Sequence, residues 1–275
     1  MSPQHQEQDH PFHLVDLSPW PILTAFSLFF VMLGAVFLMH GHPLDKYISI
    51  FGALSVIYCT YHWWKDVVAE GLVGHHHTEE VRHGLRIGMA LFISSEVMFF
   101  FAFFFSYFSA SIFPAGILDG LWVVGEGTWP PKGIETFDPW DIPFINTLIL
   151  LLSGTTVTWA HYAIGQNDQQ NAVKALGITV LLGISFTCLQ AYEYHHAGFK
   201  MIDGVYAANF YLATGFHGMH VIVGTIFLAV CYFRARKGHF AHGNGHLGFE
   251  FAAWYWHFVD VVWLFLFVFI YVLGR

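Results

Sequence analysis

The sequence predicts an all-α, polytopic membrane protein with seven transmembrane helices. Of its 275 residues, 56% are hydrophobic and only 11% are charged, which excludes an ordinary soluble domain. A helix that crosses a bilayer needs roughly 20 mostly apolar residues, and seven runs along the chain satisfy this requirement. The runs are continuously apolar rather than alternating, so they favour helices over the strands of a membrane β-barrel.

The seven predicted helices follow one another with two long interruptions. The first run comes after a polar N-terminal tail at 1–18, which lacks Lys and Arg and therefore does not read as a signal peptide. Short connections elsewhere predict that neighbouring helices pack antiparallel. The predicted spans are 19–39, 44–64, 85–109, 143–165, 172–195, 205–234 and 249–273.

The two long interruptions divide the chain. An inner loop at 65–84 separates a two-helix unit at 19–64 from a five-helix bundle at 85–275. An outer segment at 111–142 contains W-P-P at 129–131, which disfavours helix and predicts a stiff loop lying on the surface. The long inner loop therefore predicts a two-plus-five arrangement of the helices.

Charge and cysteine usage exclude several classes of protein. The net charge of −8 is spread through loops without a basic patch, so nucleic acid is not an expected partner. Cys59, Cys188 and Cys231 all fall inside predicted spans, which indicates free, membrane-buried thiols. More Lys and Arg residues fall on the N-terminal side of the membrane than opposite it, which predicts that the N-terminus lies inside and the C-terminus outside.

An acidic residue, Glu96, lies near the middle of the third predicted span. Burial in a membrane favours the protonated acid. An intramembrane acid indicates a group that handles protons or bonds to a partner, but a protonated carboxylic acid can also simply join two helices. Both interpretations stay open on the sequence alone.

His257 and Asp260 form a second polar feature at membrane depth. They are three residues apart in W-Y-W-H-F-V-D-V-V-W-L-F at 254–265, so they share a helical face. Because ionisable groups are costly in a bilayer, this face is expected to meet a protein interior, a partner or water.

The remaining histidines could belong to a cofactor site. His217 and His220 share a face in G-F-H-G-M-H, and together with His161 and His257 they raise the alternative of a haem-binding membrane cytochrome. Hydrogen bonds that stabilise the bundle are the simpler interpretation of these histidines. Another alternative is a secondary transporter with Glu96 as its coupling site, against which the lack of an internal repeat argues.

The inner loop carries residues suited to lipid headgroups. His75, His76 and His77 are consecutive and diverge, which disfavours one zinc site. The potential headgroup contacts that bracket this loop are Trp64, Glu70, His77 and Arg86; ordinary snorkelling at the membrane surface is the alternative. Glu193 near the outer end of the fifth span is typical of anchoring at the membrane interface. The sequence contains none of the common catalytic motifs of soluble enzymes.

Several strings of the sequence resemble one family, subunit III of cytochrome c oxidase in the haem–copper oxidase superfamily. They follow the family order and cover nearly everything after the tail. The strings include W-W-K-D-V-V at 63–68, G-H-H-H-T at 74–78, G-L-R-I-G-M-A-L-F-I-S-S-E-V-M-F-F at 84–100, N-T-L-I-L-L-L-S-G at 146–154, T-C-L-Q-A-Y-E-Y at 187–194, A-T-G-F-H-G-M-H at 213–220 and F-E-F-A-A-W-Y-W-H-F-V-D-V-V-W-L-F at 249–265. A longer outer loop at 115–128 departs from the family.

The resemblance implies a core subunit without its own redox centre in an energy-transducing membrane. We favour the bacterial plasma membrane over the mitochondrial inner membrane, which has the same physical properties. It implies haems and copper in partner subunits, direct contact with catalytic subunit I, subunit II in the same complex, and cytochrome c as substrate of the whole complex. Two helices would splay from five around a cleft that holds phospholipids, with headgroups at Trp64, Glu70, His77 and Arg86. Glu96 would face subunit I, near the route of oxygen, and the subunit would support proton uptake. His217, His220, Glu193 and His161 would be structural polar groups.

Overall fold

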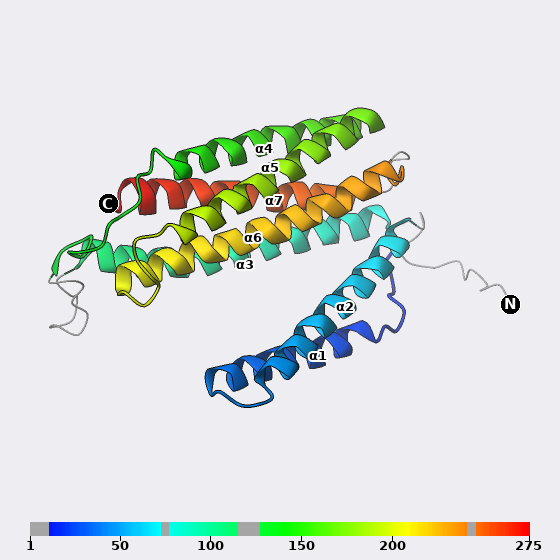
Figure 1. Cartoon of the computed structure of the whole chain (residues 1–275). Helices are drawn as coiled ribbons and strands as arrows, with labels where there is room; N and C mark the ends of the chain where they lie inside the picture. Colours follow the sequence, from blue (N-terminus) through cyan, green and yellow to red (C-terminus); the bar gives the residue numbers. More distant parts are fainter. Residues whose placement is uncertain (1–10, 73–76, 115–126, 241–245) are drawn as a thin grey trace. The chain divides into compact units, whose positions relative to one another are not determined.

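The structure, a computed structural model, describes residues 11–72, 77–114, 127–240 and 246–275. All regular secondary structure within these ranges is helical. The helices are α1 (Trp20–Met39), α2 (Asp45–Leu72), α3 (Glu79–Ile112), α4 (Ile142–Gly165), α5 (Gln169–His195), α6 (Val205–Arg236) and α7 (Leu247–Leu266), and α7 continues into a π-helical turn, η2 (Phe267–Val272) (Figure 1).

Six of these seven helices are long and apolar enough to cross a membrane. The exception among the described helices is α2, for which the sequence predicts a span at 44–64. Serine, tyrosine, threonine and histidine side chains interrupt its apolar stretch. The helix is present as expected, but its composition does not by itself mark a membrane span.

The segment expected as an inner loop is mostly helical, which corrects the prediction for 65–84. Residues 65–72 continue α2, and 79–84 form the first turns of α3. Hydropathy marks only the apolar part of a helix, whereas Lys and Glu are good helix formers and extend it into water. Of the three consecutive histidines, His75 and His76 lie outside the described residues, as does most of the unusual outer segment at 115–128.

The chain divides into two compact units, Met1–Gly84 and Leu85–Arg275. In the first unit, α1 and α2 approach closely at two glycines. A Cβ atom at Gly34 would lie 2.6 Å from Ser49 Oγ, and one at Gly52 would lie 2.6 Å from the Val31 backbone nitrogen. The Trp20 indole also donates a hydrogen bond of 2.6 Å to Asp66. The two helices therefore form a tightly packed hairpin.

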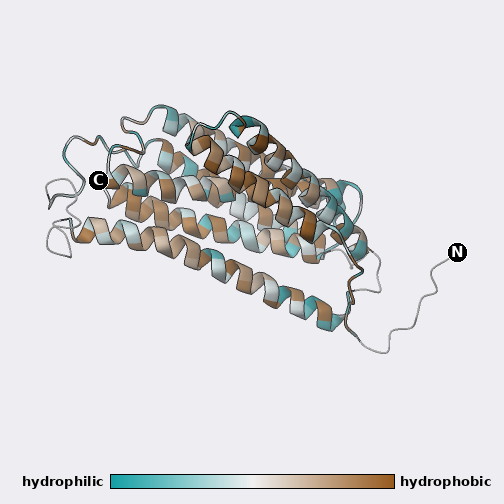
Figure 2. Ribbon diagram, turned by 90° about the horizontal axis from the view of Figure 1, so that it is seen from below, coloured by the Kyte–Doolittle hydropathy of each residue, from teal (hydrophilic) through white to brown (hydrophobic). Residues whose placement is uncertain are grey.

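In the second unit, α4, α5, α6 and α7 pack around the Trp256 side chain. Trp256 on α7 is fully buried and donates from Nε1 to Ser153 Oγ on α4 at 2.9 Å. Its ring lies against Gly183 of α5 and Gly224 of α6, where a Cβ atom would come within 2.9 Å of it. One side chain of α7 thus contacts the other three helices. Away from this core the helices present mainly hydrophobic residues, and hydrophilic residues gather toward helix ends and loops (Figure 2).

The described part of the outer loop folds back onto the second unit. The Trp129 ring packs against Tyr107 of α3 and Tyr206 of α6, with ring centroids 5.3 and 5.2 Å away. Asp138 lies 3.8 Å from the guanidinium of Arg275 at the C-terminus. Residues 127–141 therefore rest on the ends of the helices.

Candidate functional site

Glu96 forms an internal pair with His220. Its Oε2 atom lies 2.8 Å from His220 Nε2, which joins the middle of α3 to α6. The other ring nitrogen, Nδ1, lies 2.7 Å from the carbonyl oxygen of Phe216. The rings of Phe99, Phe100 and Tyr255 surround the imidazole. Aromatic side chains thus surround the imidazole of this pair, while the Glu96 side chain is 22% exposed.

The hydrogen bonds of this pair fix where one proton lies and leave a second one shared. A carbonyl oxygen only accepts, so His220 Nδ1 carries a hydrogen and donates it to Phe216. His220 Nε2 then either accepts a hydrogen from protonated Glu96 or, in the imidazolium form, donates one to the carboxylate. In both cases one exchangeable proton lies between the two side chains.

Arg86, expected at a lipid headgroup, makes a bidentate ion pair with Glu250 at the beginning of α7. Its Nε and Nη2 atoms each lie 3.0 Å from a carboxylate oxygen of Glu250. Such fork-shaped pairs are stronger than single contacts because both hydrogen bonds are charge-assisted. Glu250 was not singled out as a site residue, although it lies in the family string at 249–265.

The other expected headgroup residues belong to the first unit. Trp64 and Glu70 lie on α2, and Trp64 is exposed. His77 lies in the connection between α2 and α3. Its ring centroid is 6.1 Å from that of His13, and its Cε1 atom lies against Gly71 of α2. An aromatic, an acidic and an imidazole side chain therefore occur along this end of the hairpin.

The buried polar side chains His217 and Glu193 bond within the bundle. His217 donates from Nε2 to the carbonyl oxygen of Val259 on α7, at 3.1 Å. Glu193 accepts a 2.6 Å hydrogen bond from the Tyr271 hydroxyl and is only 1% exposed. Glu193 therefore points into the bundle rather than toward lipid, because its helix turns this side chain toward η2. His161 differs from both: it is exposed, with its ring edge toward Phe249.

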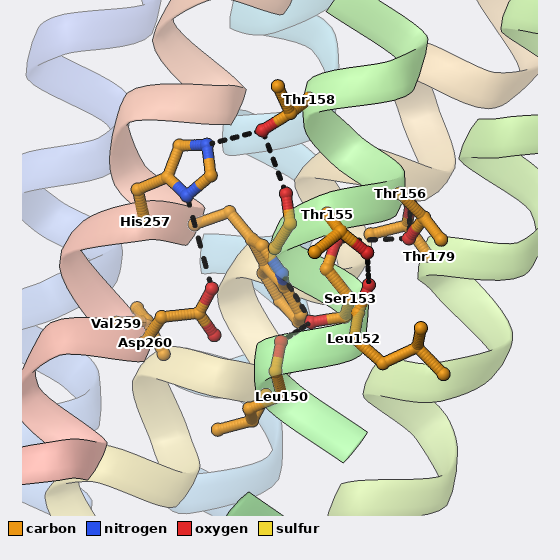
Figure 3. Close-up of polar contacts among 12 residues, drawn as sticks. Leu150, Leu152, Ser153, Thr155, Thr156, Thr158, Thr179, His257, Val259 and Asp260 are labelled. Carbon is orange, nitrogen blue, oxygen red and sulfur yellow. Dashed lines mark hydrogen bonds and ion pairs between the residues drawn. The ribbon is translucent and has the colours of Figure 1, made fainter. Parts of the chain in front are cut away.

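His257 and Asp260 lie at a different place from Glu96, on the face of α7 that meets α4 (Figure 3). Asp260 Oδ2 is 4.0 Å from His257 Nδ1, which is too long for a hydrogen bond. Thr158 donates its hydroxyl hydrogen to the Gly154 carbonyl, so His257 Nε2, at 3.4 Å, donates to Thr158 Oγ1. Glu96 and this pair, which the sequence marks as two polar features at membrane depth, lie at two separate sites.

A groove of about 460 Å³ runs between α4 and α7 at this second site. Within the described ranges, no side chain or backbone group bonds to the buried Oδ1 atom of Asp260. A Cβ atom at Gly154 would lie 2.7 Å from Asp260 Oδ2, so glycine leaves the space that the carboxyl group occupies. We call this feature the α4–α7 groove, and its lining residues are Leu151, Gly154, Thr155 and Thr158 on α4 and His257, Asp260, Val261 and Leu264 on α7.

The histidines that raised the haem alternative are engaged in other contacts. Both ring nitrogens of His220 and the Nε2 atom of His217 have hydrogen-bond partners. Across the part of the chain that the structure describes, no three potential metal-ligating side chains come together. His217 and His220 act within the bundle as hydrogen-bonding groups.

Comparison with known proteins identifies one family over nearly the whole chain. The family model described as cytochrome c oxidase subunit III matches residues 10–275. A protein of Rickettsia bellii named "Probable cytochrome c oxidase subunit 3" is 65% identical over 268 residues, covering 97% of each chain. Proteins named "Cytochrome c oxidase subunit 3" from Prototheca wickerhamii and Arabidopsis thaliana are 54% and 51% identical, covering 96% and 97% of this chain and 98% and 97% of their own.

Proposed function

The chain belongs to the cytochrome c oxidase subunit III family, and from this premise we propose that it stabilises the catalytic subunit, binds phospholipid and supports proton uptake and oxygen access. As a subunit of cytochrome c oxidase, it works in a complex with other subunits and lies in an energy-transducing membrane, which its helices cross several times. The family's reaction, the reduction of oxygen to water, belongs to that complex.

We assign the haems and copper to partner subunits, with subunit I in direct contact, subunit II in the same complex and cytochrome c as the electron donor. The proposed membrane is the bacterial plasma membrane, with the N-terminus inside and the C-terminus outside. We also propose a two-plus-five arrangement of the helices with a lipid-binding cleft; the division of the chain into two compact units supports the grouping of the helices. In this chain His217, His220, Glu193 and His161 are structural polar groups, a role supported for the first three by hydrogen bonds to neighbouring helices.

The observation that carries the functional proposal is the pair formed by Glu96 and His220. It fixes α3 to α6 at membrane depth through a 2.8 Å contact and holds an exchangeable proton there. A carboxyl group whose only task is to join helices needs no titratable partner, whereas in this pair a proton can pass between the carboxyl group and the imidazole without changing the net charge of the pair. The pair therefore serves both stability and proton exchange in the complex.

Two substitutions of Glu96 separate these roles. In Glu96→Gln the amide still donates to His220 Nε2, so helix packing and assembly are retained while the transferable proton is lost. Glu96→Leu removes both. We expect Glu96→Gln to assemble normally but to lose activity faster than wild type during prolonged turnover, and Glu96→Leu to reduce the amount of assembled oxidase as well.

Assembly is measured by the haem that co-purifies with the tagged chain, and turnover stability by oxygen consumption over many cycles. His196→Gln at the exposed end of α5 is the matched control, since its ring contacts, among the described residues, are with Tyr192 and His195 of the same helix. If Glu96→Gln kept wild-type activity throughout prolonged turnover, the proton-handling role of Glu96 would be wrong, and only its structural role would stand.

The lipid role of Trp64, Glu70, His77 and Arg86 requires a control for the ion pair of Arg86. Arg86→Ala removes a possible headgroup contact and also breaks the pair with Glu250. Glu250→Gln weakens the same pair but keeps the arginine charge. We expect mass spectrometry of the purified oxidase to show less anionic phospholipid for Arg86→Ala and His77→Ala, but not for Glu250→Gln. Equal lipid in all variants would exclude headgroup binding at Arg86 and His77.

A further inference from the structure

We propose that the α4–α7 groove receives a hydroxyl or amide side chain from a transmembrane helix of another subunit, which bonds to Asp260. This proposal uses only one part of the proposed function, namely that the chain works in a multi-subunit complex. It concerns a different face of α7 from the one that contacts Glu96 and His220.

The groove follows the helix axes over a length that can hold part of another helix. Its lining residues recur at intervals of three and four on both helices, from Leu151 to Thr158 and from His257 to Leu264. This spacing extends the groove over two helical turns, roughly 10 Å, parallel to the helix axes. Val261 and Leu151 on its rim are 52% and 45% exposed, so the groove opens at the surface of the second unit.

Asp260 supplies an incomplete polar contact inside this groove. The residue is only 8% exposed, and its Oδ1 atom has no hydrogen-bond partner among the described residues. A buried polar atom without a partner is costly, and more so where lipid replaces water. The carboxyl group cannot be displaced toward α4, because the Gly154 backbone lies directly against it. The Oδ1 atom has almost no accessible surface, so a donor that enters from the open side of the groove reaches the carboxyl group at Oδ2, which lies 4.0 Å from His257 Nδ1.

The depth of the site favours a protein helix over a phospholipid as the occupant. Gly154 lies halfway along α4, and Asp260 lies halfway along the continuous helical segment Leu247–Val272. The hydrocarbon core is about 30 Å thick, so phospholipid headgroups are about 15 Å from this level. At that depth a phospholipid presents only hydrocarbon. Backbone groups of a transmembrane helix are already paired, so the donor is a side chain.

Small and hydroxyl-bearing residues on α4 also suit close helix packing. Gly154 and Thr158 are four residues apart on one face, which is the small-xxx-small spacing found where membrane helices meet. His257 and Thr158 add donor and acceptor groups beside Asp260. A hydroxyl or amide side chain both donates and accepts, so it can bond to Asp260 whether the carboxyl group is ionised or protonated.

Photo-crosslinking in the assembled oxidase tests the proposal. Benzoylphenylalanine replaces Val261 at the rim of the groove, and in a control protein it replaces Leu181, an exposed residue of α5. We expect Val261 to cross-link to a transmembrane peptide of another subunit, identified by mass spectrometry, and Leu181 not to cross-link to that peptide. Cross-linking of Val261 to lipid alone or to a second copy of this chain, the absence of any product, or the same peptide at Leu181 would each overturn the proposal.

A pair of substitutions tests the hydrogen bond itself. Asp260→Asn keeps the size and hydrogen-bonding capacity of the side chain, whereas Asp260→Leu removes the capacity. Hydrogen bonds between membrane helices correspond to about a three- to twenty-fold change in association. We therefore expect the tagged Asp260→Leu chain to retain its partner subunit that much less through detergent dilution, while Asp260→Asn retains it as wild type does.

Equal retention of the partner by Asp260→Leu and wild type would overturn the role of Asp260. If the Asp260→Leu chain does not accumulate in the cell, the Val261 cross-linking experiment, in which Asp260 is unchanged, tests the proposal instead. A different result would contradict the proposed function, namely that no haem-bearing subunit co-purifies with the wild-type chain. An oxidase that co-purifies but gives no cross-link from Val261 overturns only the groove proposal.

Discussion

The contact of α6 with Trp256 at Gly224 should not tolerate one additional methyl group. A Cβ atom at Gly224 would lie 2.9 Å from Cε3 and 3.1 Å from Cζ3 of this fully buried ring, where ordinary contacts begin at 3.4 Å. The ring has little freedom to move away, because its neighbouring Cη2 atom lies against Gly183 of α5 and its Nε1 atom is bonded to Ser153. Gly224→Ala must therefore separate α6 from α7.

Gly218→Ala is the matched control, because it lies on the same helix and a Cβ atom there would meet nothing within 4 Å. Both substitutions gain the advantage of alanine over glycine in a helix, roughly 0.5–1 kcal/mol. Only Gly224→Ala adds an overpacking cost of about 1–3 kcal/mol. We therefore expect the free energy of unfolding to differ between the two variants by about 1–3 kcal/mol, with Gly224→Ala the less stable.

Pulse proteolysis of the purified complex over a series of SDS concentrations measures this difference, read from the gel band of this chain. In a Trp256→Leu background the obstructing ring is absent, so the cost of Gly224→Ala should largely disappear. The reasoning is refuted if Gly224→Ala and Gly218→Ala unfold at the same SDS concentration in the otherwise native chain.

Two further side-chain pairs give predictions that the same proteolysis assay measures. Tyr271→Phe removes the hydroxyl that donates to Glu193 and leaves this buried carboxyl group without that partner, so a loss of about 1–3 kcal/mol is expected; unchanged stability would mean that Glu193 finds another donor. Arg86→Lys keeps the positive charge but cannot make the bidentate contact with Glu250. Because this pair is partly exposed, we expect the free energy of unfolding to fall by at most about 1 kcal/mol. A loss as large as that of Tyr271→Phe would contradict this view of a partly exposed pair.

Most of the helices could be predicted from the sequence, because membrane helices are marked by continuous apolar runs. The predicted span at 143–165 matches α4 (Ile142–Gly165) to one residue, and 205–234 matches α6 (Val205–Arg236) at its beginning. The predictions failed where helices continue past the membrane. Hydropathy cannot show that the last eight residues of α2 and the first turns of α3 are helical, because these residues are polar although many of them favour helix.

The polar sites were predicted as residues but not as pairs. Glu96 was identified as an acid at membrane depth and His220 as one of two histidines in G-F-H-G-M-H, yet they are 124 positions apart and only the packing of α3 on α6 joins them. Asp260 could be found by its spacing from His257, whereas Gly154 gave no signal, because its role is to leave space for a carboxyl group on another helix. Pairing across helices depends on tertiary packing that periodicity does not encode.

Three polar contacts hold α3 in the bundle, and their spacing explains why Glu96 is placed where it is. Arg86 bonds to α7, Glu96 to α6, and the Tyr107 hydroxyl to the Phe269 carbonyl oxygen at 3.0 Å. These residues are about three helical turns apart, so they lie near one face of α3. Lipid tails are as apolar as the helix surface and give no hydrophobic drive for α3 to pack, so the polar contacts set its rotation and depth. Loss of the middle contact leaves both ends of α3 attached. For that reason Glu96→Leu should loosen the centre of α3, where the proton is held, without releasing the helix from the bundle.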